Sequence, residues 1–139
     1  MYIETAPTMK IGTDLDGVLL TFKFLNPSVK LPQWLYLPLA IFALLCPPNF
    51  VIKRILQFAA KNNEIIVISA RPKWFAPLTA SWLKFHRIPF NKLYCVGFGK
   101  GTKERKLEII RKEGIDIYFE DDKRIVQFFK KHAIKVLSI

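Results

Sequence analysis

The sequence has few of the residues that build disulfide frameworks or zinc sites. Its 139 residues include two cysteines, Cys46 and Cys95, and two histidines, His86 and His132. The histidines show no ligand spacing relative to the cysteines, so we expect reduced, apolar cysteines and no zinc site. The first ten residues, MYIETAPTMK, lack a basic segment followed by a long apolar stretch. This pattern predicts no signal peptide and a cytoplasmic protein.

Acidic residues are also scarce relative to basic ones. The chain has 11 aspartates and glutamates against 22 lysines and arginines, for a net charge of +11. This balance favours anionic partners, namely phosphorylated metabolites, nucleic acid or an acidic membrane surface, and charge alone does not choose among them. Lysine enrichment also accompanies growth at high temperature, so a solvated basic surface is an alternative.

Charge of either sign is missing from residues 31–52, LPQWLYLPLAIFALLCPPNFVI. The length approaches the roughly 20 residues of a membrane span, but four prolines interrupt it and the clean apolar core is only about a dozen residues. We therefore expect a small cap-like helical insertion, 22–50, packed over the active-site edge. A membrane-surface or homodimer contact is the alternative, and a membrane span is disfavoured.

Elsewhere, apolar strand patterns alternate with helical ones. The expected strands cover 9–15, 64–70, 91–97, 115–120 and 133–139, and the expected helices cover 49–63, 74–88, 102–114 and 122–132. In the first helix, Val51, Ile55, Phe58 and Ala59 share one face. Thr102 is the expected N-cap of the third helix and Gly114 its stop. The pattern predicts a single α/β domain over 1–139, a doubly wound parallel sheet of about five strands with helices on both faces.

Polar residues gather where the expected strands end. The ends read Asp14-Leu15-Asp16-Gly17, Ser69-Ala70-Arg71 and Glu120-Asp121-Asp122. Ligands bind at the carboxyl ends of parallel strands, so these side chains converge if the first strand lies between the second and the fourth. So many carboxylates repel one another unless a cation lies among them, and hard oxygen ligands without histidine favour Mg²⁺. A magnesium ion with a lysine and an arginine is suited to phosphate chemistry.

These segments resemble the motifs of one enzyme family. DLDGVL resembles the D-x-D-G motif of the haloacid-dehalogenase superfamily of phosphohydrolases, IIVISARP its second motif and IDIYFEDD its fourth, with several lysines available for the third. The resemblance runs from about Lys10 to the C-terminus and is to small-cap, nucleotidase-like members. It implies a Rossmann-like fold and a Mg²⁺-dependent phosphoric monoester hydrolase that acts on a small phosphorylated substrate.

The resemblance also implies roles for individual residues. Asp14 would be the nucleophile that forms an aspartyl-phosphate, and Asp16 would act first as acid and then as base. Lys106 would neutralise charge on the phosphate, although Lys100 and Lys103 compete for this role. The implied metal ligands are Asp14, Asp16, Glu120 and Asp121, and the implied substrate contacts are Ser69, Ala70, Arg71 and Lys103. The alternative for Asp122 is a helix-starting acid, and for Arg71 a surface arginine.

Three functions stay open at this point. A phosphatase acting on a phosphomonoester is the leading hypothesis, with a nucleotide as the favoured substrate. A phosphatase that acts on nucleic-acid ends is the second, because the net charge is positive and a short insertion leaves the site open. A catalytically idle phosphate-binding or membrane-peripheral module is the third. A short insertion also permits a partner subunit to complete the pocket.

Overall fold

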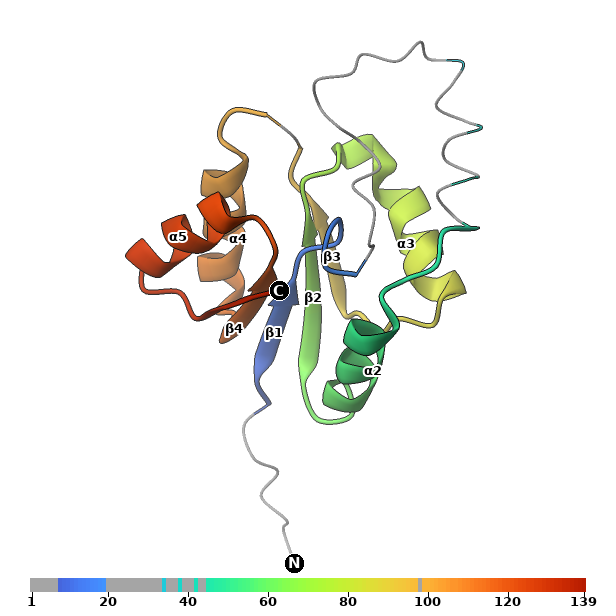
Figure 1. Ribbon diagram of the computed structural model, residues 1–139, viewed down its shortest axis with the longest axis horizontal. Coiled ribbons are helices and arrows are strands. Elements are labelled where there is room, and N and C mark those ends of the chain that lie inside the picture. Colours follow the sequence, from blue (N-terminus) through green and yellow to red (C-terminus); the bar gives the residue numbers. More distant parts are fainter. Residues whose placement is uncertain (1–7, 20–33, 35–37, 39–41, 43–44, 98) are drawn as a thin grey trace, which may run out of the picture.

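The computed structural model describes residues 8–19, 34, 38, 42, 45–97 and 99–139, which form a parallel sheet between two layers of helices (Figure 1). The sheet has five strands in the order β3-β2-β1-β4-β5, and all paired neighbours are parallel. The strands are β1 (Lys10–Thr13), β2 (Glu64–Ser69), β3 (Lys92–Cys95), β4 (Ile117–Glu120) and β5 (Val136–Ser138). The predicted doubly wound α/β fold is confirmed.

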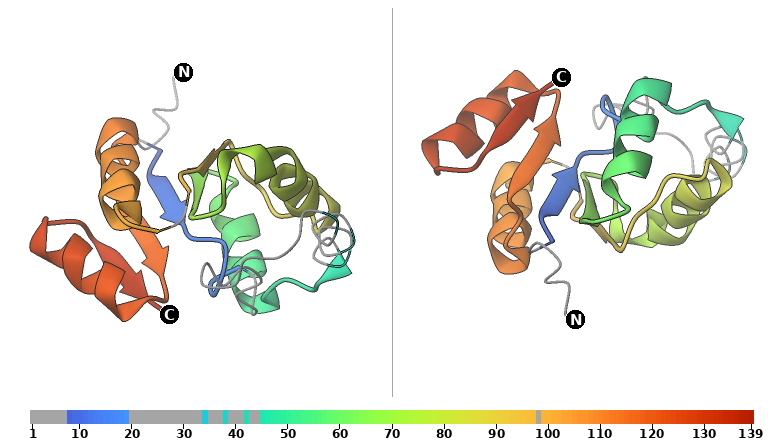
Figure 2. Two further views of the ribbon diagram at one scale, coloured as in Figure 1. Left: turned by 90° about the horizontal axis from the view of Figure 1, so that it is seen from above. Right: turned by 90° about the horizontal axis from the view of Figure 1, so that it is seen from below.

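The helices lie on both faces of the sheet because each crossover between parallel strands carries one. They are α2 (Phe50–Ala59), α3 (Ala76–Phe85), α4 (Thr102–Glu113) and α5 (Lys123–Lys131), with a short 3₁₀ turn, η1 (Lys73–Phe75), before α3. Figure 2 shows α2 and α3 on one side of the sheet and α4 and α5 on the other. From β1 the sheet grows to one side through β2 and β3 and to the other side through β4 and β5. The strand order therefore reverses beside β1, and a binding cleft is expected at the carboxyl end of this strand.

Alternating side chains of β2 supply both halves of the core. Ile65 and Val67 pack with the buried side of α2 and α3, whereas Ile66 and Ile68 pack with α4 and α5. On β1, an ideal Cβ at Gly12 would meet the Tyr118 ring at 2.6 Å, so only glycine lets β4's tyrosine cross over β1 at this point. Burial on both faces explains why the strands read as continuous apolar runs.

The spacing in residues 49–63 does produce a helix, α2, but its buried face is made by Ile52 and Leu56. Val51, Ile55 and Phe58, which the spacing places together, are exposed to solvent. Asn49 caps the helix by accepting hydrogen bonds from the backbone N–H groups of Val51 and Ile52. The periodicity therefore predicts the helix correctly but not the face that packs against the sheet, which is the adjacent face with Ile52 and Leu56.

Helix α4 begins one residue earlier than expected, because its N-cap is Gly101 and not Thr102. Gly101, at a φ of 87°, is the N-cap, and the Thr102 hydroxyl instead donates to the carbonyls of Gly97 and Gly99 at 3.0 and 2.8 Å. Gly114, at a φ of 66°, ends the helix as expected. Most of the expected insertion, 22–50, lies outside the described residues. Among the helices that the structure describes, none combines the length and apolar composition that crossing a membrane requires.

Candidate active site

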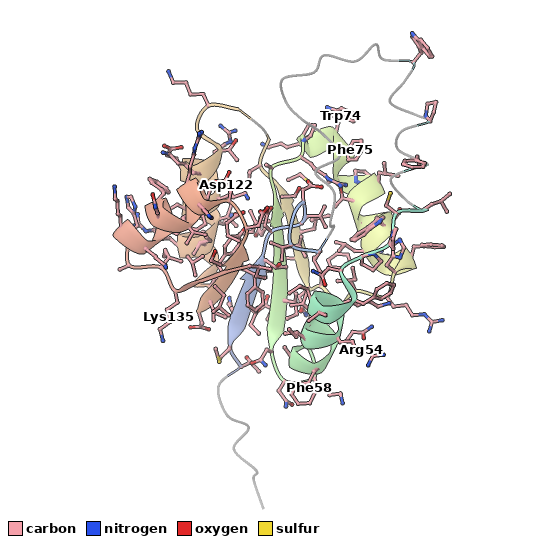
Figure 3. The ribbon with its side chains drawn as sticks, viewed as in Figure 1. Arg54, Phe58, Trp74, Phe75, Asp122 and Lys135 are labelled. Carbon is pink, nitrogen blue, oxygen red and sulfur yellow. The ribbon has the colours of Figure 1, made fainter. Side chains whose placement is uncertain are left out.

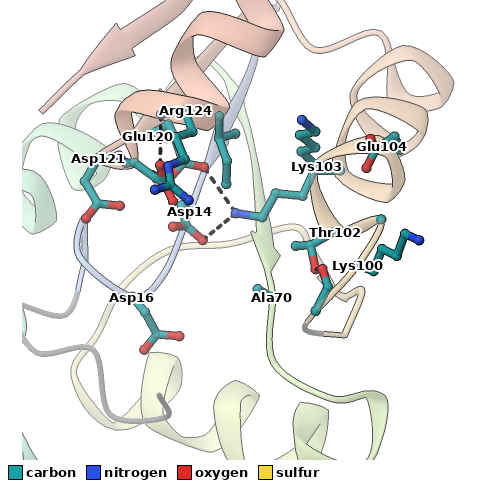
Figure 4. Close-up of a pocket in the computed structure, with 15 residues that line it drawn as sticks. Asp14, Asp16, Ala70, Lys100, Thr102, Lys103, Glu104, Glu120, Asp121 and Arg124 are labelled. Atoms are coloured by element: carbon teal, nitrogen blue, oxygen red, sulfur yellow. Dashed lines mark hydrogen bonds and ion pairs between the residues drawn. The ribbon is translucent and has the colours of Figure 1, made fainter. Parts of the chain in front are cut away.

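A buried lysine joins the ends of two neighbouring strands. Asp14 follows β1 directly, and its backbone N–H donates to the carbonyl of Phe119 in β4 at 3.0 Å. The Lys106 Nζ, from α4, lies 3.1 Å from Asp14 Oδ1 and 3.1 Å from Glu120 Oε2 (Figure 4). All three side chains are almost fully buried. Two carboxylates thus share one ammonium group at the centre of the carboxyl edge.

The charges of this trio are unbalanced. Burial raises the pKa of the Glu120 carboxyl to about 8, and the neighbouring Asp14 charge adds to this effect. Burial also raises the pKa of Asp14, against the opposing charge of Lys106. Burial alone would lower the pKa of Lys106, but the negative groups around it, Asp14 foremost, together outweigh burial and raise the pKa well above its ordinary value. The site therefore holds one more negative group than its lysine can neutralise, and a further cation would be favoured.

Asp16 is held by Arg71 rather than by solvent. The guanidinium donates through Nη2 to Asp16 Oδ1 at 2.9 Å and through Nε to Oδ2 at 3.2 Å. Arg71 is itself 2% exposed, donates to the Thr79 hydroxyl at 3.3 Å and has its guanidinium 5.4 Å from the centre of the Phe75 ring. The alternative of a surface arginine is therefore wrong. A buried, two-pronged ion pair fixes the Asp16 carboxylate at the pocket wall.

The other predicted residues lie around the same edge. Ser69 is fully buried and its hydroxyl accepts the Arg71 backbone N–H at 3.1 Å, while Ala70 lines the pocket. Asp122 caps α5 by accepting the Arg124 N–H at 2.9 Å, as its helix-starting alternative expects. Lys103 lines the pocket with its ammonium 4.9 Å from the centre of the Phe128 ring. Of the three competing lysines, Lys106 is the one for which the structure shows an ion pair with Asp14.

Three carboxylates are arranged so that they could hold a metal ion. Asp14, Glu120 and Asp121 each offer an oxygen, and these oxygens lie within 4.8 Å of one another. Gly17, at a φ of 89°, makes room for them, since an added Cβ would come within 2.1 Å of Asp121 Oδ2. Hard oxygen donors without a sulfur or imidazole ligand in the group suit Mg²⁺. The residues present therefore fit the ion that the motifs imply.

An open pocket of about 640 Å³ lies in front of these groups. Its lining includes several residues that the motifs do not single out, among them Thr102 and Arg124. Arg124 stands in the first turn of α5, and Thr102 opens α4 after a glycine-rich loop. Both residues stand in the first turn of a helix that follows a strand, and this position is the signal that could have found them. Thr79 and Phe75, which hold Arg71, give no comparable signal because their contacts form only in the folded chain.

The sequence is similar to several nucleotidases. It is 33% identical over 70 residues to a candidate nucleotidase of Halalkalibacterium halodurans and 27% identical over 88 residues to a nucleotidase of Clostridium acetobutylicum. The first match covers 50% of this chain and 33% of the relative, and the second covers 63% and 43%. The chain thus spans less than half the length of these relatives. No protein-family model matches it.

Solved structures share the fold. A chain of the Pnkp1/Rnl/Hen1 RNA repair complex superposes with a TM-score of 0.72 and 18% identity, covering 100% of this chain and 45% of that one. A haloacid-dehalogenase-like hydrolase of Streptococcus pneumoniae superposes with a TM-score of 0.57 and 14% identity, covering 94% and 84%. The predicted resemblance is therefore confirmed: this chain is similar in sequence to nucleotidases and has the fold of haloacid-dehalogenase-like hydrolases.

Proposed function

We propose that the protein is a metal-dependent phosphatase that hydrolyses a phosphomonoester, with a nucleotide as the favoured substrate. The observation that carries this proposal is the trio of Asp14, Lys106 and Glu120, buried at the carboxyl edge and facing the pocket. Similarity to nucleotidases supports hydrolysis of phosphate esters as the reaction class. A pocket of about 640 Å³ is within the usual size range for a small-molecule site.

In the first half of the proposed reaction, a carboxylate oxygen of Asp14 attacks the phosphorus atom of the substrate. The bond from phosphorus to the ester oxygen breaks, and an aspartyl-phosphate forms on Asp14. Asp16 gives its proton to the departing oxygen, so that an alcohol leaves rather than an alkoxide. Lys106 places a positive charge beside the oxygens that carry the growing negative charge.

In the second half, Asp16 is ionised and accepts a proton from a water molecule that attacks the phosphorus atom. The bond between phosphorus and Asp14 breaks, which releases inorganic phosphate and restores both carboxyl groups. The ion pair with Arg71 holds the Asp16 carboxylate in place at the pocket wall for this step. For the acid step the Asp16 carboxyl has to turn from Arg71 toward the pocket, whose wall it already forms.

The magnesium ion would be held by the side chains of Asp14 and Asp121 and by the backbone carbonyl of Asp16. When bound, it orients the phosphoryl oxygens and offsets their charge. Glu120 is less suited to direct ligation, although its oxygens are close enough. Its Oε1 accepts the backbone N–H groups of Asp121 and Asp122, and its Oε2 faces Lys106. We assign Glu120 to positioning the lysine and the Asp121 loop.

The test is the substitution Asp14→Asn, assayed on a panel of phosphomonoesters with Mg²⁺ and with EDTA. We expect kcat to fall by at least about 10⁴-fold, as for other removed nucleophiles, and EDTA to abolish wild-type turnover. The matched control is Asp116→Asn, whose carboxylate accepts the Lys10 N–H at 2.8 Å at the far edge of the sheet and should leave kcat unchanged. Wild-type turnover by Asp14→Asn would refute the nucleophile assignment.

A phosphatase acting on nucleic-acid ends is the second candidate. The fold shared with a chain of an RNA repair complex and three cationic residues at the pocket, Lys100, Lys103 and Arg124, favour it. The test compares hydrolysis of a terminally phosphorylated oligonucleotide with that of the matching mononucleotide. This candidate expects the oligonucleotide to be preferred at low salt and the preference to fall steeply as salt rises. Equal kcat/KM at all salt concentrations would exclude it.

A further inference from the structure

Helix α2 presents a large apolar surface to solvent. Phe50, Val51, Ile55 and Phe58 are 63%, 67%, 46% and 77% exposed, respectively. With Arg54, which stands between them on the helix, these residues form what we call the outer face of α2. Helices of globular proteins normally turn such residues inward, yet the inward side of α2 is already filled by Ile52 and Leu56. A contiguous exposed patch of this kind marks a binding surface.

The sequence segment that carries this face is basic and contains no acid. No aspartate or glutamate occurs between Asp16 and Glu64. Lys53 lies with its Nζ 5.9 Å from the centre of the Phe50 ring, and Lys61 with its Nζ 5.6 Å from the centre of the Phe58 ring. Each end of the helix therefore has one phenylalanine ring with a lysine ammonium group beside it. The chemistry of the face combines apolar side chains with positive charge.

From these observations we infer that the outer face of α2 docks on an anionic lipid bilayer. Apolar side chains enter the boundary between headgroups and acyl chains, and Lys53, Arg54 and Lys61 meet the negative headgroups. The uncharged segment leading into the helix adds further exposed apolar side chains, at Trp34, Phe42 and Leu45. A protein partner with an apolar groove would not by itself explain why every charge of this region is positive.

The position of the face allows the pocket to work at the same time. Helix α2 runs toward the start of β2, and the outward direction of Arg54 and Phe58 is visible in Figure 3. The pocket lies at the opposite, carboxyl edge. It is lined by β4, α4, α5 and the loops that follow β1, β2 and β3, without a residue of α2. Docking through α2 would leave the pocket open to solvent. The inference is thus independent of the catalytic assignment.

The experiment is flotation of the full chain with vesicles of phosphatidylcholine alone and of phosphatidylcholine with phosphatidylserine. We expect binding to the anionic vesicles and little to the neutral ones. The variant I55S/F58S should bind at least about tenfold more weakly, and K53Q/R54Q about tenfold more weakly. The charge-matched control K130Q/K131Q, on α5, and the single control Phe85→Ser, on α3, whose phenylalanine is 61% exposed, should bind as the parent does.

Three results would overturn the inference. One is absence of binding to the anionic vesicles by the parent chain. Another is equal loss of binding in the α5 control and in the α2 variants, which would assign binding to net charge alone. The third is a concentration-dependent dimer, seen by light scattering, that I55S/F58S abolishes, because the face would then belong to a second copy of the chain. The melting temperature of I55S/F58S should be close to that of the parent, because both side chains are solvent-exposed. This measurement shows that a loss of vesicle binding does not come from unfolding.

Discussion

Two clusters of charged side chains stand at opposite edges of the same sheet. At the carboxyl edge, Lys106 is shared by Asp14 and Glu120. At the amino edge, Glu113 at the end of α4 accepts hydrogen bonds from the Lys92 ammonium at 2.9 Å and from the Tyr94 hydroxyl. Lys10 approaches both Glu113 and Glu64, with Nζ to oxygen distances of 4.0 and 3.8 Å. Each cluster joins strand ends to a helix.

The two clusters respond to their surroundings in opposite directions. Hydrogen bonds from Lys92 and Tyr94 lower the pKa of Glu113, so its ionised form is favoured. Burial raises the pKa of Glu120 to about 8, so its ionised form is disfavoured. The amino-edge cluster is complete as it stands, with two lysines for two glutamates. The carboxyl-edge cluster is short of a positive charge, and such an imbalance facing a pocket is typical of a functional site.

The largest difference should follow from removing the lysine at each edge. Lys106→Met leaves two buried carboxylates without their ammonium, which costs about 3–5 kcal/mol of folding stability when one partner of a buried pair is lost. It should also lower kcat by at least about 10³-fold, because the phosphoryl charge loses its nearest cation. Denaturant unfolding and steady-state kinetics measure the two effects.

Lys92→Met is the matched substitution at the amino edge. The Lys92 side chain is 46% exposed and water screens its ion pairs, so we expect a small fall in melting temperature and an unchanged kcat. A loss of activity in Lys92→Met as large as in Lys106→Met would mean that the lysines act through the fold as a whole. The loss of activity in Lys106→Met would then not show a catalytic role for Lys106.

A smaller effect is expected at Arg71, which contacts Asp16 and is placed as a positioning residue. Arg71→Lys keeps the charge but loses the two-pronged grip on the carboxylate. Misplacing the acid and base should lower kcat by roughly 10- to 100-fold and leave KM nearly unchanged. An altered KM with a normal kcat would instead place Arg71 on the substrate.

A metal ion should reverse the pH dependence of stability at the carboxyl edge. Glu120 titrates near pH 4.5 when unfolded and near 8 when folded, so the metal-free folded state binds more protons between these values. The free energy of unfolding should therefore fall as pH rises from 5 to 8, by about 3–4 kcal/mol. Magnesium favours the ionised carboxylates, so it should raise the melting temperature more at pH 8 than at pH 5.5. An equal rise at both pH values would contradict a site built from these acids.

The sequence predicts the strands, their parallel pairing and the convergence of Asp14, Ser69 and Glu120, because these depend on patterns within short segments. Buried strands are apolar on both faces, and polar residues at their ends share one edge of a parallel sheet. It does not predict that Arg71 lies buried against Asp16, since the direction of this long side chain depends on tertiary contacts with Thr79 and Phe75. Nor does it predict which side of α2 packs, because both sides carry apolar residues and tertiary contacts decide.

The smallest expected effect belongs to the amino edge itself. Glu113→Gln removes a carboxylate whose pKa is lowered in the folded state by Lys92 and Tyr94. Its ionised form therefore adds stability above the unfolded pKa of about 4.5, and this contribution is lost as pH falls through the folded value. At pH 7 the variant should melt slightly below the parent, at pH 3 the two should nearly coincide, and kcat should not change. A melting difference that grew as pH fell would mean that the fold stabilises the protonated form of Glu113. The pKa values of Glu113 and Glu120 would then no longer be shifted in opposite directions.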